Sequence, residues 1–554
     1  MGQAGQAHSA MAIVLGLNLG HDGAAAIIKN GRLVAAISRE RLSRKKKDTG
    51  IGKAELDYVL DIAGCKLSDV DVIAFSTYNY APDNYIKIFR LNGEEVRHNL
   101  WDHPPRVMTL DFKAGIGGRQ QAAIFVQHHL AHCASAFYTS NFNEAACFSL
   151  DASAHRPEAC SLFAYGMGAE LHPLYCPGLM IGNTYSLFTE KLGLGDGLFK
   201  SGTTMGLASY GKPLPMAVEH CARYGESFYE RRFQPDDDRF IELMWSELSG
   251  LPPSVGLSKQ ESDSRRAMDI AASLQYVFEE TIIKAANELQ RKTAAYANGN
   301  LCLSGGSFYN CNANSAVLKR TKFERLSLFP ACGDDGTAIG AGLFVAHTMM
   351  DEKRVNYEPE EIVFLGRRYE SPRVGRPLDP DEVASALAAG KVIGWYQGRS
   401  EFGPRALGNR SILADPRNPA MRDRINREIK KREWFRPFAP IVLAERAAEW
   451  FDFDRESPFM LFTARVLDPD LVPAISHVDG SARLQTVTPS GNAPIYDLVA
   501  RFDRLTNVPM LLNTSLNIGG EPLVETPEDA VRFWQTTPVD MMVIGDRMLV
   551  RGEA

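Results

Sequence analysis

The chain contains no apolar run of about 18 residues or more, the length that a helix needs to cross a membrane. The apolar stretch Ala12–Leu17 is too short to be the core of a signal peptide. A basic excess is also missing, because 61 Lys and Arg residues against 67 Asp and Glu residues give a formal net charge of −6. The sequence therefore predicts neither a membrane nor a nucleic acid as a partner.

A disulfide pattern is equally absent from the sequence. The nine cysteines lie between Cys65 and Cys332, form no CxxC pair and are odd in number. This pattern is typical of free thiols in a reducing compartment and not of a disulfide framework. We therefore expect a cytoplasmic protein. Residues 1–10 read as a flexible tail that does not contribute to the fold.

Two groups of three short apolar runs suggest a duplicated unit. The first group spans Ala12–Leu19, Ala24–Lys29 and Arg32–Ser38, and the second spans Ala145–Leu150, Ala159–Tyr165 and Leu171–Tyr175. Asn30-Gly31 joins two runs of the first group and predicts a type I′ hairpin, because both residues tolerate positive φ. An acidic residue, Asp22 or Asp151, follows the first run of each group, which supports the duplication.

Helical patterns accompany these runs, at Lys53–Ala63 and Arg265–Arg291, and indicate layers of strands and helices. At 554 residues the chain is too long for one hydrophobic core. A charged stretch with prolines, roughly 351–379, reads as a linker, and a second α/β unit follows it. We therefore predict an α/β protein with domains at 11–355 and 375–554.

Two histidines one helical turn apart form the first candidate site. The stretch QHHLAHCAS at 127–135, if helical, places His128 and His132 on one face, where both could bind one metal ion. His129 points elsewhere and is the weaker ligand. The alternative is a pair of ordinary histidines whose hydrogen bonds are satisfied within the protein.

Acidic turns could complete this metal site. Asp151 ends a strand-like run, and Asp334 or Asp335 lies in a glycine-flanked turn. Helix capping and turn formation would equally explain aspartates at such places. Two imidazoles with one or two carboxylates suit Fe(II), Mn(II) or Zn(II) better than Mg²⁺.

Two glycine-containing turns are candidates for phosphate binding. The first joins two strand-like runs and could equally be a plain hairpin turn, whereas the second lies at a strand-to-helix junction, where exposed N–H groups favour an anion. The turns are 16–23, which contains His21 and Asp22, and 303–310, which contains Gly305, Gly306 and Asn310. Neither a Walker pattern nor a full GxGxxG fingerprint is present.

Basic residues occur in two places that could bind a polyanion. The run Arg39–Lys47 is typical of a solvated charged face, although its position also allows anion contact. In the C-terminal unit the candidates are Arg405, Lys430, Arg432, Arg483, Ser515 and Asn517. Lys430 and Arg432 would face the same side of a strand, as would Ser515 and Asn517. Structural salt bridges are the alternative to a polyanionic small molecule here.

On these residues the sequence resembles the O-carbamoyltransferases of antibiotic and nodulation-factor biosynthesis, the group that contains the tobramycin, novobiocin and cephamycin enzymes. The most specific stretches are VQHHLAHCASAFY, GPRALGNRSIL, KKREWFRPFAP, ARLQTV and NTSLNIGGEPLVETPEDA, which occur in this order. The similarity covers nearly the whole chain.

The resemblance implies a fold and a reaction. It implies an N-terminal domain with the duplicated actin/sugar-kinase-type fold, like the tRNA threonylcarbamoyl transferase, and a C-terminal YrdC-like α/β domain. The implied reaction converts carbamoyl phosphate to carbamate, activates the carbamate with ATP as a carbamoyl-adenylate, and transfers carbamoyl to a hydroxyl of a natural product in secondary metabolism. Fe(II) is the implied metal, Mg²⁺ accompanies ATP, and an oligomer is left open.

Matching positions imply the roles of single residues. The implied metal ligands are His128, His132, Asp151 and Asp334; the catalytic residues are His21, Asp22, Lys430 and Arg432; and the nucleotide-binding residues are Gly305, Gly306, Asn310, Arg405, Arg483, Ser515 and Asn517. His21 is the candidate for a general base or a contact to the adenylate.

Two positions depart from the family pattern. Ala152–His155 replaces a Gly-rich acidic turn, so we expect acceptor binding or metal geometry to differ. Thr203 stands where the family commonly has a lysine, so we expect that anion contact to be absent or supplied by Lys200.

Two other functions remain open from the sequence. A small-molecule kinase with an actin-type fold would release ADP and a phosphorylated product, whereas a carbamoyltransferase of this kind releases AMP and pyrophosphate. A non-catalytic nucleotide-binding or tRNA-modification protein would need a basic surface, which the net charge of −6 argues against. The motifs do not identify the acceptor.

Overall fold

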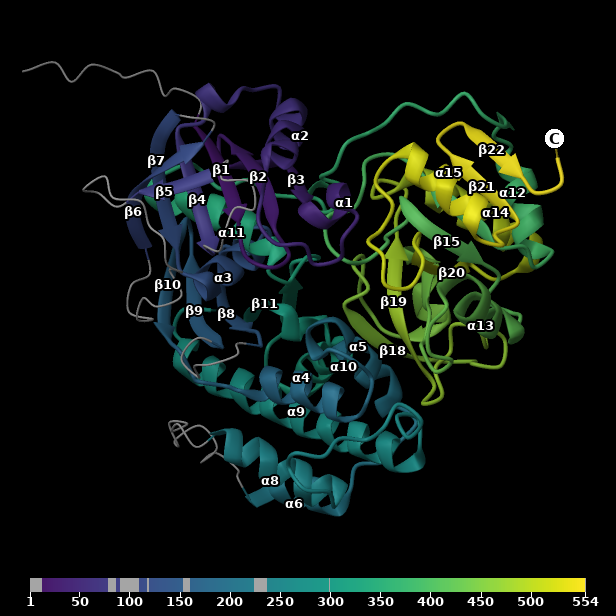
Figure 1. The fold of residues 1–554 in the computed structure, drawn as a ribbon, viewed down its shortest axis with the longest axis horizontal. Coiled ribbons are helices and arrows are strands. Elements are labelled where there is room, and N and C mark those ends of the chain that lie inside the picture. The colour runs from purple at the N-terminus through teal and green to yellow at the C-terminus, as the bar shows by residue number, and fades with distance from the viewer. Residues whose placement is uncertain are drawn as a thin grey trace, which may run out of the picture.

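The computed structural model describes residues 12–77, 86–89, 109–116, 119–152, 160–223, 237–297 and 299–553. Within these ranges the chain forms three β-sheets with helices packed against them (Figure 1). Strands between residues 13 and 328 build the first two sheets, and strands between 376 and 550 build the third, which lies beside them. This arrangement confirms the predicted α/β class. The expected tail 1–10 and Ser153–His155 lie outside the described residues.

The first two sheets share one topology. Their strands are β1 (Ile13–Asn18), β2 (Ala24–Lys29), β3 (Arg32–Ser38), β4 (Val72–Thr77), β5 (Ile86–Phe89), β6 (Thr109–Ile116) and β7 (Arg119–Val126), and then β8 (Glu144–Leu150), β9 (Ser161–Met167), β10 (Glu170–Tyr175), β11 (Asn300–Ser304) and β12 (Arg325–Leu328). The orders are β3-β2-β1-β4-β7-β6-β5 and β10-β9-β8-β11-β12. In both, an antiparallel meander is followed by two parallel strands, which confirms the predicted duplication.

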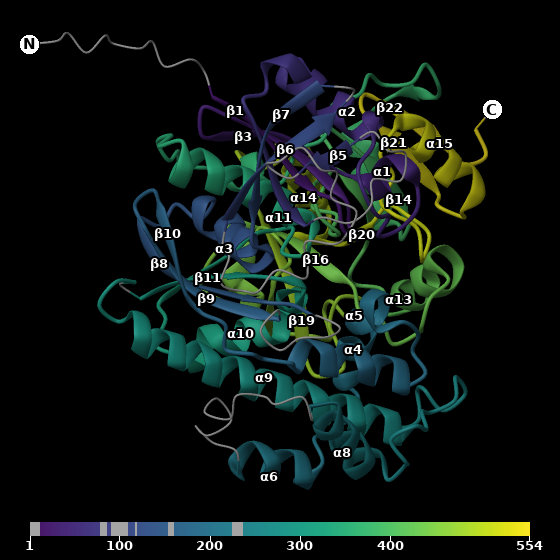
Figure 2. The same cartoon turned by 60° about the vertical axis from the view of Figure 1, so that its left-hand side comes forward.

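Helices cover and separate these two sheets. They are α1 (Arg39–Ser43), α2 (Lys53–Ala63), α3 (His128–Tyr138), α4 (Ile181–Lys191), α5 (Gly197–Ala208), α6 (Pro215–Arg223), α8 (Asp237–Ser249), α9 (Arg265–Thr293), α10 (Cys311–Arg320) and α11 (Asp335–Phe344). Figure 2 shows the long helix α9 running below the second sheet, with α3 and α11 above it. Within the described stretches, no helix combines the length and the apolar character that crossing a membrane requires.

Helices α3 and α11 meet between the two sheets at very short range. A Cβ atom on Gly340 of α11 would lie 1.8 Å from the carbonyl oxygen of Ala131 in α3, so only glycine permits this approach. The contact brings Asp334, which precedes α11, next to the first turns of α3. His128 and His132 lie in those turns. The packing of two helices therefore assembles residues from distant parts of the sequence.

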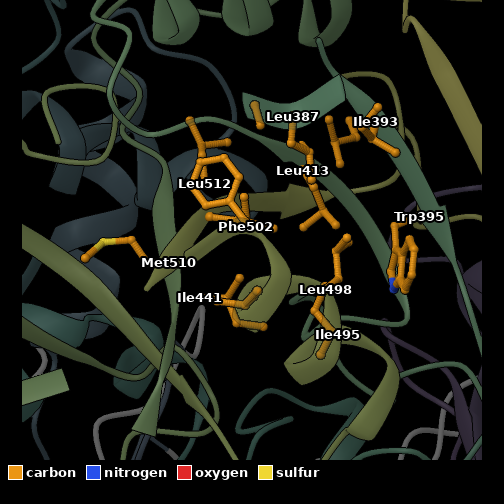
Figure 3. Packing of buried hydrophobic residues seen from close by; sticks show 14 of the residues in the cluster. Leu387, Ile393, Trp395, Leu413, Ile441, Ile495, Leu498, Phe502, Met510 and Leu512 are labelled. Atoms are coloured by element: carbon orange, nitrogen blue, oxygen red, sulfur yellow. The ribbon is translucent and has the colours of Figure 1, made fainter. Parts of the chain in front are cut away.

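The third sheet has its own hydrophobic core. Its strands are β13 (Arg376–Pro377), β14 (Ile393–Tyr396), β15 (Arg410–Ala414), β16 (Ala439–Leu443), β17 (Phe451–Asp452), β18 (Phe462–Val466), β19 (Ser481–Val487), β20 (Met510–Ser515), β21 (Met541–Ile544) and β22 (Arg547–Val550), and its helices are α12 (Pro380–Ala388), α13 (Ala420–Arg424), α14 (Ala493–Thr506) and α15 (Pro527–Thr536). The strand order is β13-β22-β21-β14-β15-β20-β16-β19-β18-β17. Leu387 of α12 and Phe502 of α14 pack with Leu413 and Leu512 of the sheet (Figure 3).

The structure corrects the prediction that two pairs of candidate residues share strand faces. Lys430 ends the π-helix η7 (Ile425–Lys430), and Lys431 follows in the left-handed region with φ of 48°. Arg432 therefore lies beyond the helix, in irregular structure. Ser515 is the last residue of β20, so Asn517 lies beyond the strand. These side chains converge through a helix end and a loop, which periodicity alone does not reveal.

Only part of the basic run Arg39–Lys47 is the solvated face that we considered typical, because Lys45 and Lys46 are exposed whereas Arg41 and Arg44 contact the C-terminal part. Arg41 is buried and donates hydrogen bonds to the carbonyl oxygens of Glu401 and Gly403, at 3.0 and 2.6 Å. Arg44 donates to the carbonyl oxygens of Pro522 and Leu523. Most of these contacts satisfy carbonyl groups of the C-terminal part. The run therefore joins the two parts of the chain.

A buried carboxylate reinforces this junction. Glu525, which is fully buried, accepts hydrogen bonds from the hydroxyl groups of Tyr58 (2.6 Å), Ser400 (3.0 Å) and Tyr369 (3.3 Å). Tyr58 belongs to α2, and Tyr369 lies in the stretch that we read as a linker. A buried charge needs such partners, so these contacts favour one relative position of the two parts.

Replacing Gly340 with alanine tests the close contact of α3 and α11. We expect Gly340→Ala to lower the free energy of unfolding by about 1–3 kcal/mol, because the added methyl group meets backbone. The matched control is Gly202→Ala in α5, where a Cβ would have open space. Urea unfolding of both variants measures the difference. Equal stability of Gly340→Ala and the parent protein would contradict the contact.

Candidate functional site

One cavity of about 810 Å³ is lined by candidate residues from both halves of the chain. His21, Asp151 and Asp334 line it from the N-terminal part, and Lys430 and Arg432 line it from the C-terminal part. The sequence suggested two chemically different pockets. The structure instead shows two walls of different chemistry that face one space.

The first wall contains an imidazole-carboxylate cluster. The Nε2 atoms of His128 and His132 lie 3.2 Å apart. Oδ1 of Asp334 lies 3.4 Å from Nε2 of His128, and Oδ2 of Asp151 lies 3.3 Å from Nε2 of His132. Each of the four side chains offers a ligand atom, and these atoms all lie within 4.8 Å of one another. Two helices and the end of β8 thus bring together the four residues that the sequence singled out.

These four side chains fit a divalent metal ion. Contacts outside the cluster orient two of the four: Nδ1 of His132 lies 3.4 Å from Oγ of Ser304, and Asp151 accepts N–H groups from Ala152 and Gly306. Such outer contacts orient ligands at metal sites. Two nitrogen and two oxygen donors suit a first-row transition metal.

The neighbouring residues His129 and Asp335 point away from the cluster. Nδ1 of His129 lies 3.1 Å from Oγ of Ser149. Asp335 accepts a hydrogen bond from Ser38, and burial raises the pKa of its carboxyl group to about 7. The structure therefore distinguishes Asp334 from Asp335, which the sequence did not.

Charges within the cluster are strongly coupled. Burial lowers the pKa of His132, but hydrogen bonds to Asp151 and Asp334 outweigh it and raise that pKa to about 9. Burial raises the pKa of Asp334, but the positive charges of His21 and His128 outweigh it and hold the pKa well below its usual range. The carboxylates therefore favour positive charge at this position.

His21 lies between the cluster and the open cavity. Its Nε2 atom is 3.3 Å from Oδ2 of Asp334, and its Nδ1 atom is 3.1 Å from Oδ2 of Asp22. The charge on Asp334 is the main reason that the pKa of His21 is raised to about 9, despite burial. Asp22 also pairs with Nζ of Lys47 at 3.3 Å. His21 and Asp22 thus form a proton-carrying pair at the cavity wall.

The backbone of the turn 303–310 packs closely against the end of β8. Gly305 has φ of 102°, and a Cβ there would lie 2.1 Å from the carbonyl oxygen of Leu150. Gly306 and Asn310 line the cavity. The Asn310 side chain caps α10 by accepting the Ala313 N–H and also exchanges hydrogen bonds with Gln275. Its amide therefore shapes the turn.

The second wall is formed by a lysine held at a fixed position. Nζ of Lys430 donates to Oγ of Ser515 at 3.0 Å, to the carbonyl oxygen of Ser515 at 2.7 Å and to Asn517. Nε of Arg432 donates to Oδ1 of Asn426 at 2.7 Å. The predicted Lys-x-Arg and Ser-x-Asn elements therefore meet, although neither lies on one strand face.

Positive charges crowd behind this wall. Burial and then the charge of Arg432 hold the pKa of Lys430 well below its usual range. Burial and then the charge of Arg405 lower the pKa of Arg483 to about 9. Within the described residues, Nε of Arg405 and Nε of Arg483 are buried without a hydrogen-bond partner. A bound polyanion would offset this repulsion.

Three further residues of the cavity were missed or left open by the sequence. Lys46 and Arg436 line it, and Lys46 comes from the run that we read as solvated. Nη1 of Arg436 donates a hydrogen bond to Oγ1 of the buried Thr203 at 2.7 Å. Thr203, which stands where the family commonly has a lysine, therefore contacts a cation of the C-terminal part. Lys200 lines the cavity and pairs with Glu433 at 3.3 Å. Arg436 could have been found, because it belongs to the KKREWFRPFAP stretch.

Two family models match the chain. The model described as Carbamoyltransferase N-terminus matches residues 13–89 and 91–343, and the model described as Carbamoyltransferase C-terminus matches 384–551. Together they cover most of the sequence and both walls of the cavity.

Similar proteins extend this result. An uncharacterised protein of Synechocystis sp. is 35% identical over 96% of this chain and 95% of its own length. The nodulation protein NolNO of Sinorhizobium fredii is 34% identical over 96% of this chain and 79% of its own length. A 3'-hydroxymethylcephem-O-carbamoyltransferase of Amycolatopsis lactamdurans is 39% identical over 46% of this chain and 49% of its own length. Among solved structures, a dehydratase activator from Clostridium difficile has a TM-score of 0.32 at 12% identity, covering 62% of this chain and 99% of its own, values too low to bear on function.

Added polyanions should stabilise the protein if the second wall binds them. We expect tripolyphosphate at about 100 times its Kd to add about 2.7 kcal/mol to the free energy of unfolding. Arg432→Met should reduce this gain, whereas Arg455→Met, which changes a cation paired with the exposed Asp454, should keep it. Thermal unfolding with and without the anion measures the gain. Equal gains in both variants would contradict an anion site at this wall.

Proposed function

The chain belongs to the carbamoyltransferase family, and on this premise we propose that it is an ATP-dependent O-carbamoyltransferase that uses carbamoyl phosphate to carbamoylate a hydroxyl group of a small molecule. The observation that carries the proposal is the single cavity, in which a cationic wall faces an imidazole-carboxylate wall. Two walls of different chemistry suit a reaction that first activates and then transfers one group.

Activation belongs to the cationic wall. Water releases phosphate from carbamoyl phosphate to leave carbamate, and a carbamate oxygen then attacks the α-phosphorus of ATP, so that pyrophosphate leaves and carbamoyl-adenylate forms. Lys430 and Arg432 offset the negative charge that grows on the leaving pyrophosphate. Ser515 and Asn517 hold the Lys430 amine in place, so little reorganisation is needed as the charge develops.

Further cations could contact the phosphates of ATP beside Lys430 and Arg432. Arg405 and Arg436 line the same cavity, and Arg483 lies within electrostatic reach of Arg405. We assign Arg405 and Arg483 to phosphate binding, and the turn with Gly305, Gly306 and Asn310 to a nucleotide contact. The cationic wall belongs to residues 375–554, which we propose to be a YrdC-like adenylate-forming domain, with Mg²⁺ accompanying ATP.

Transfer belongs to the first wall, within residues 11–355. The acceptor oxygen attacks the carbamoyl carbon, the bond from that carbon to the phosphate oxygen of AMP breaks, and the hydroxyl proton passes to a base. Asp22 is the candidate base, and His21, which its raised pKa of about 9 keeps protonated near neutral pH, is the candidate hydrogen-bond donor to the adenylate; the two line the cavity and lie 3.1 Å apart.

A divalent ion held by His128, His132, Asp151 and Asp334 would act as a Lewis acid toward the negative charge that develops during transfer. We propose Fe(II), with Mn(II) or Zn(II) as alternatives that the donor set also suits. The four ligand atoms lie within 4.8 Å of one another, which is close enough for all of them to contact one ion.

Separate variants of the two walls should lose different steps. We expect Lys430→Ala to abolish ATP–pyrophosphate exchange in the presence of carbamoyl phosphate, because the pyrophosphate then lacks its partner. His128→Ala should keep the exchange but lower the formation of the carbamate ester by at least about 100-fold, the loss typical of removing transition-state stabilisation. Radiolabelled pyrophosphate and product mass spectrometry measure the two steps.

Other products would contradict the proposal. Loss of both steps in both variants would refute the division between the walls. Release of ADP with a phosphorylated product, in place of AMP and pyrophosphate, would identify a kinase. Absence of any turnover with carbamoyl phosphate would favour a non-catalytic nucleotide-binding protein.

Metal content gives a test that does not depend on activity. The parent protein should bind about one divalent transition-metal ion per chain, whereas His132→Ala should bind little, because a four-ligand site loses a nitrogen donor. His172→Ala is the matched control, since His172 is partly exposed and pairs with Glu170 away from the cluster. Elemental analysis after dialysis measures the stoichiometry. Equal metal content in all three proteins would refute the assigned ligands.

A further inference from the structure

From the cavity walls we infer the class of the acceptor: a molecule that carries its hydroxyl next to a flat apolar ring. This inference rests on the proposed function. It names the kind of acceptor that binds beside the first wall, where we place the transfer step. It comes from residues outside the motifs that carry the family resemblance.

Two adjacent apolar side chains are exposed inside the cavity. Leu198 and Phe199 lie in the first turn of α5, are 40% and 44% exposed, and line the cavity. Other strongly exposed apolar residues, such as Val478 and Leu505, do not line it. Apolar surface within a concave site is stabilised when a ligand covers it. Leu198 and Phe199 therefore mark where an apolar part of a ligand lies.

A chain of contacts places this apolar surface beside the transfer wall. Nζ of Lys47 lies 5.6 Å from the centre of the Phe199 ring. The same Nζ atom lies 3.3 Å from Oδ2 of Asp22, which is 3.1 Å from Nδ1 of His21. A molecule whose hydroxyl meets His21 is therefore close enough for its carbon skeleton to cover Phe199. We assign the apolar surface to the acceptor because this chain of contacts ends on His21, which we propose to lie beside the transfer step.

Further residues of α4, α5 and α9 line the same cavity. Met205 lies in the helix that carries Phe199, and the rings of Tyr185 and Phe278 meet edge to face with centres 5.2 Å apart. Other lining residues of α4 and α5 are small, namely Gly182, Ser186, Ser201 and Gly202.

Matched acceptors test the inference on the full-length, metal-loaded protein. Phenyl β-glucoside and glucose offer similar hydroxyl groups and differ in the apolar ring. With ATP, Mg²⁺ and carbamoyl phosphate, we expect kcat/KM for phenyl β-glucoside to exceed that for glucose by about tenfold, the effect of covering one aromatic face. Product mass spectrometry and AMP release measure the rates.

A variant of the apolar surface completes the test. Phe199→Ser should bring the ratio between phenyl β-glucoside and glucose close to one, mainly through KM, whereas Leu471→Ala should leave it unchanged, because Leu471 is 53% exposed outside the cavity. The inference is overturned if the parent protein carbamoylates glucose as well as phenyl β-glucoside, if it carbamoylates neither while still forming AMP and pyrophosphate, or if Phe199→Ser keeps the parent ratio. Failure of the parent protein to form pyrophosphate from ATP and carbamoyl phosphate would instead refute the proposed function.

Discussion

The close packing of α3 against α11 is the constraint on which the cluster of His128, His132, Asp151 and Asp334 depends. Because Gly340 has no side chain, the two helices approach until a Cβ would touch the carbonyl oxygen of Ala131. This approach carries Asp334 to within 3.4 Å of His128 and 3.5 Å of His132. A looser contact would separate the carboxylate from the imidazoles. The contact that packs the two helices therefore also positions the candidate metal ligands.

The cationic wall depends on a second constraint, the junction between the two parts of the chain. Arg41 and Arg44 satisfy carbonyl groups of the C-terminal part, and Glu525 accepts the hydroxyl of Tyr58. These buried contacts hold Lys46 beside cations that lie hundreds of residues away. The resulting cavity is lined by cations of the C-terminal part and by carboxylate and imidazole side chains of the N-terminal part.

Much of the fold could be predicted from local patterns, whereas the cavity could not. The Asn30-Gly31 hairpin was predicted from turn chemistry, and both residues have positive φ, at 52° and 71°. The spacing of His128 and His132 needed only a helix to bring them together. Lys430 and Arg432 were assigned the wrong local structure, because a π-helix and a left-handed turn leave no periodic signal. The role of Lys46 was missed because its partners come from the other part of the chain.

Complementation between inactive variants tests most directly whether both walls serve one cavity. Lys430→Ala and His128→Ala proteins, mixed in equal amounts with all substrates, should form no more carbamate ester than the sum of the two alone. More ester than this sum would require the adenylate made by one chain to leave its cavity and enter the cavity of another chain. Recovery of a large part of the parent rate in the mixture would contradict the account, because the two walls would then act as independent sites.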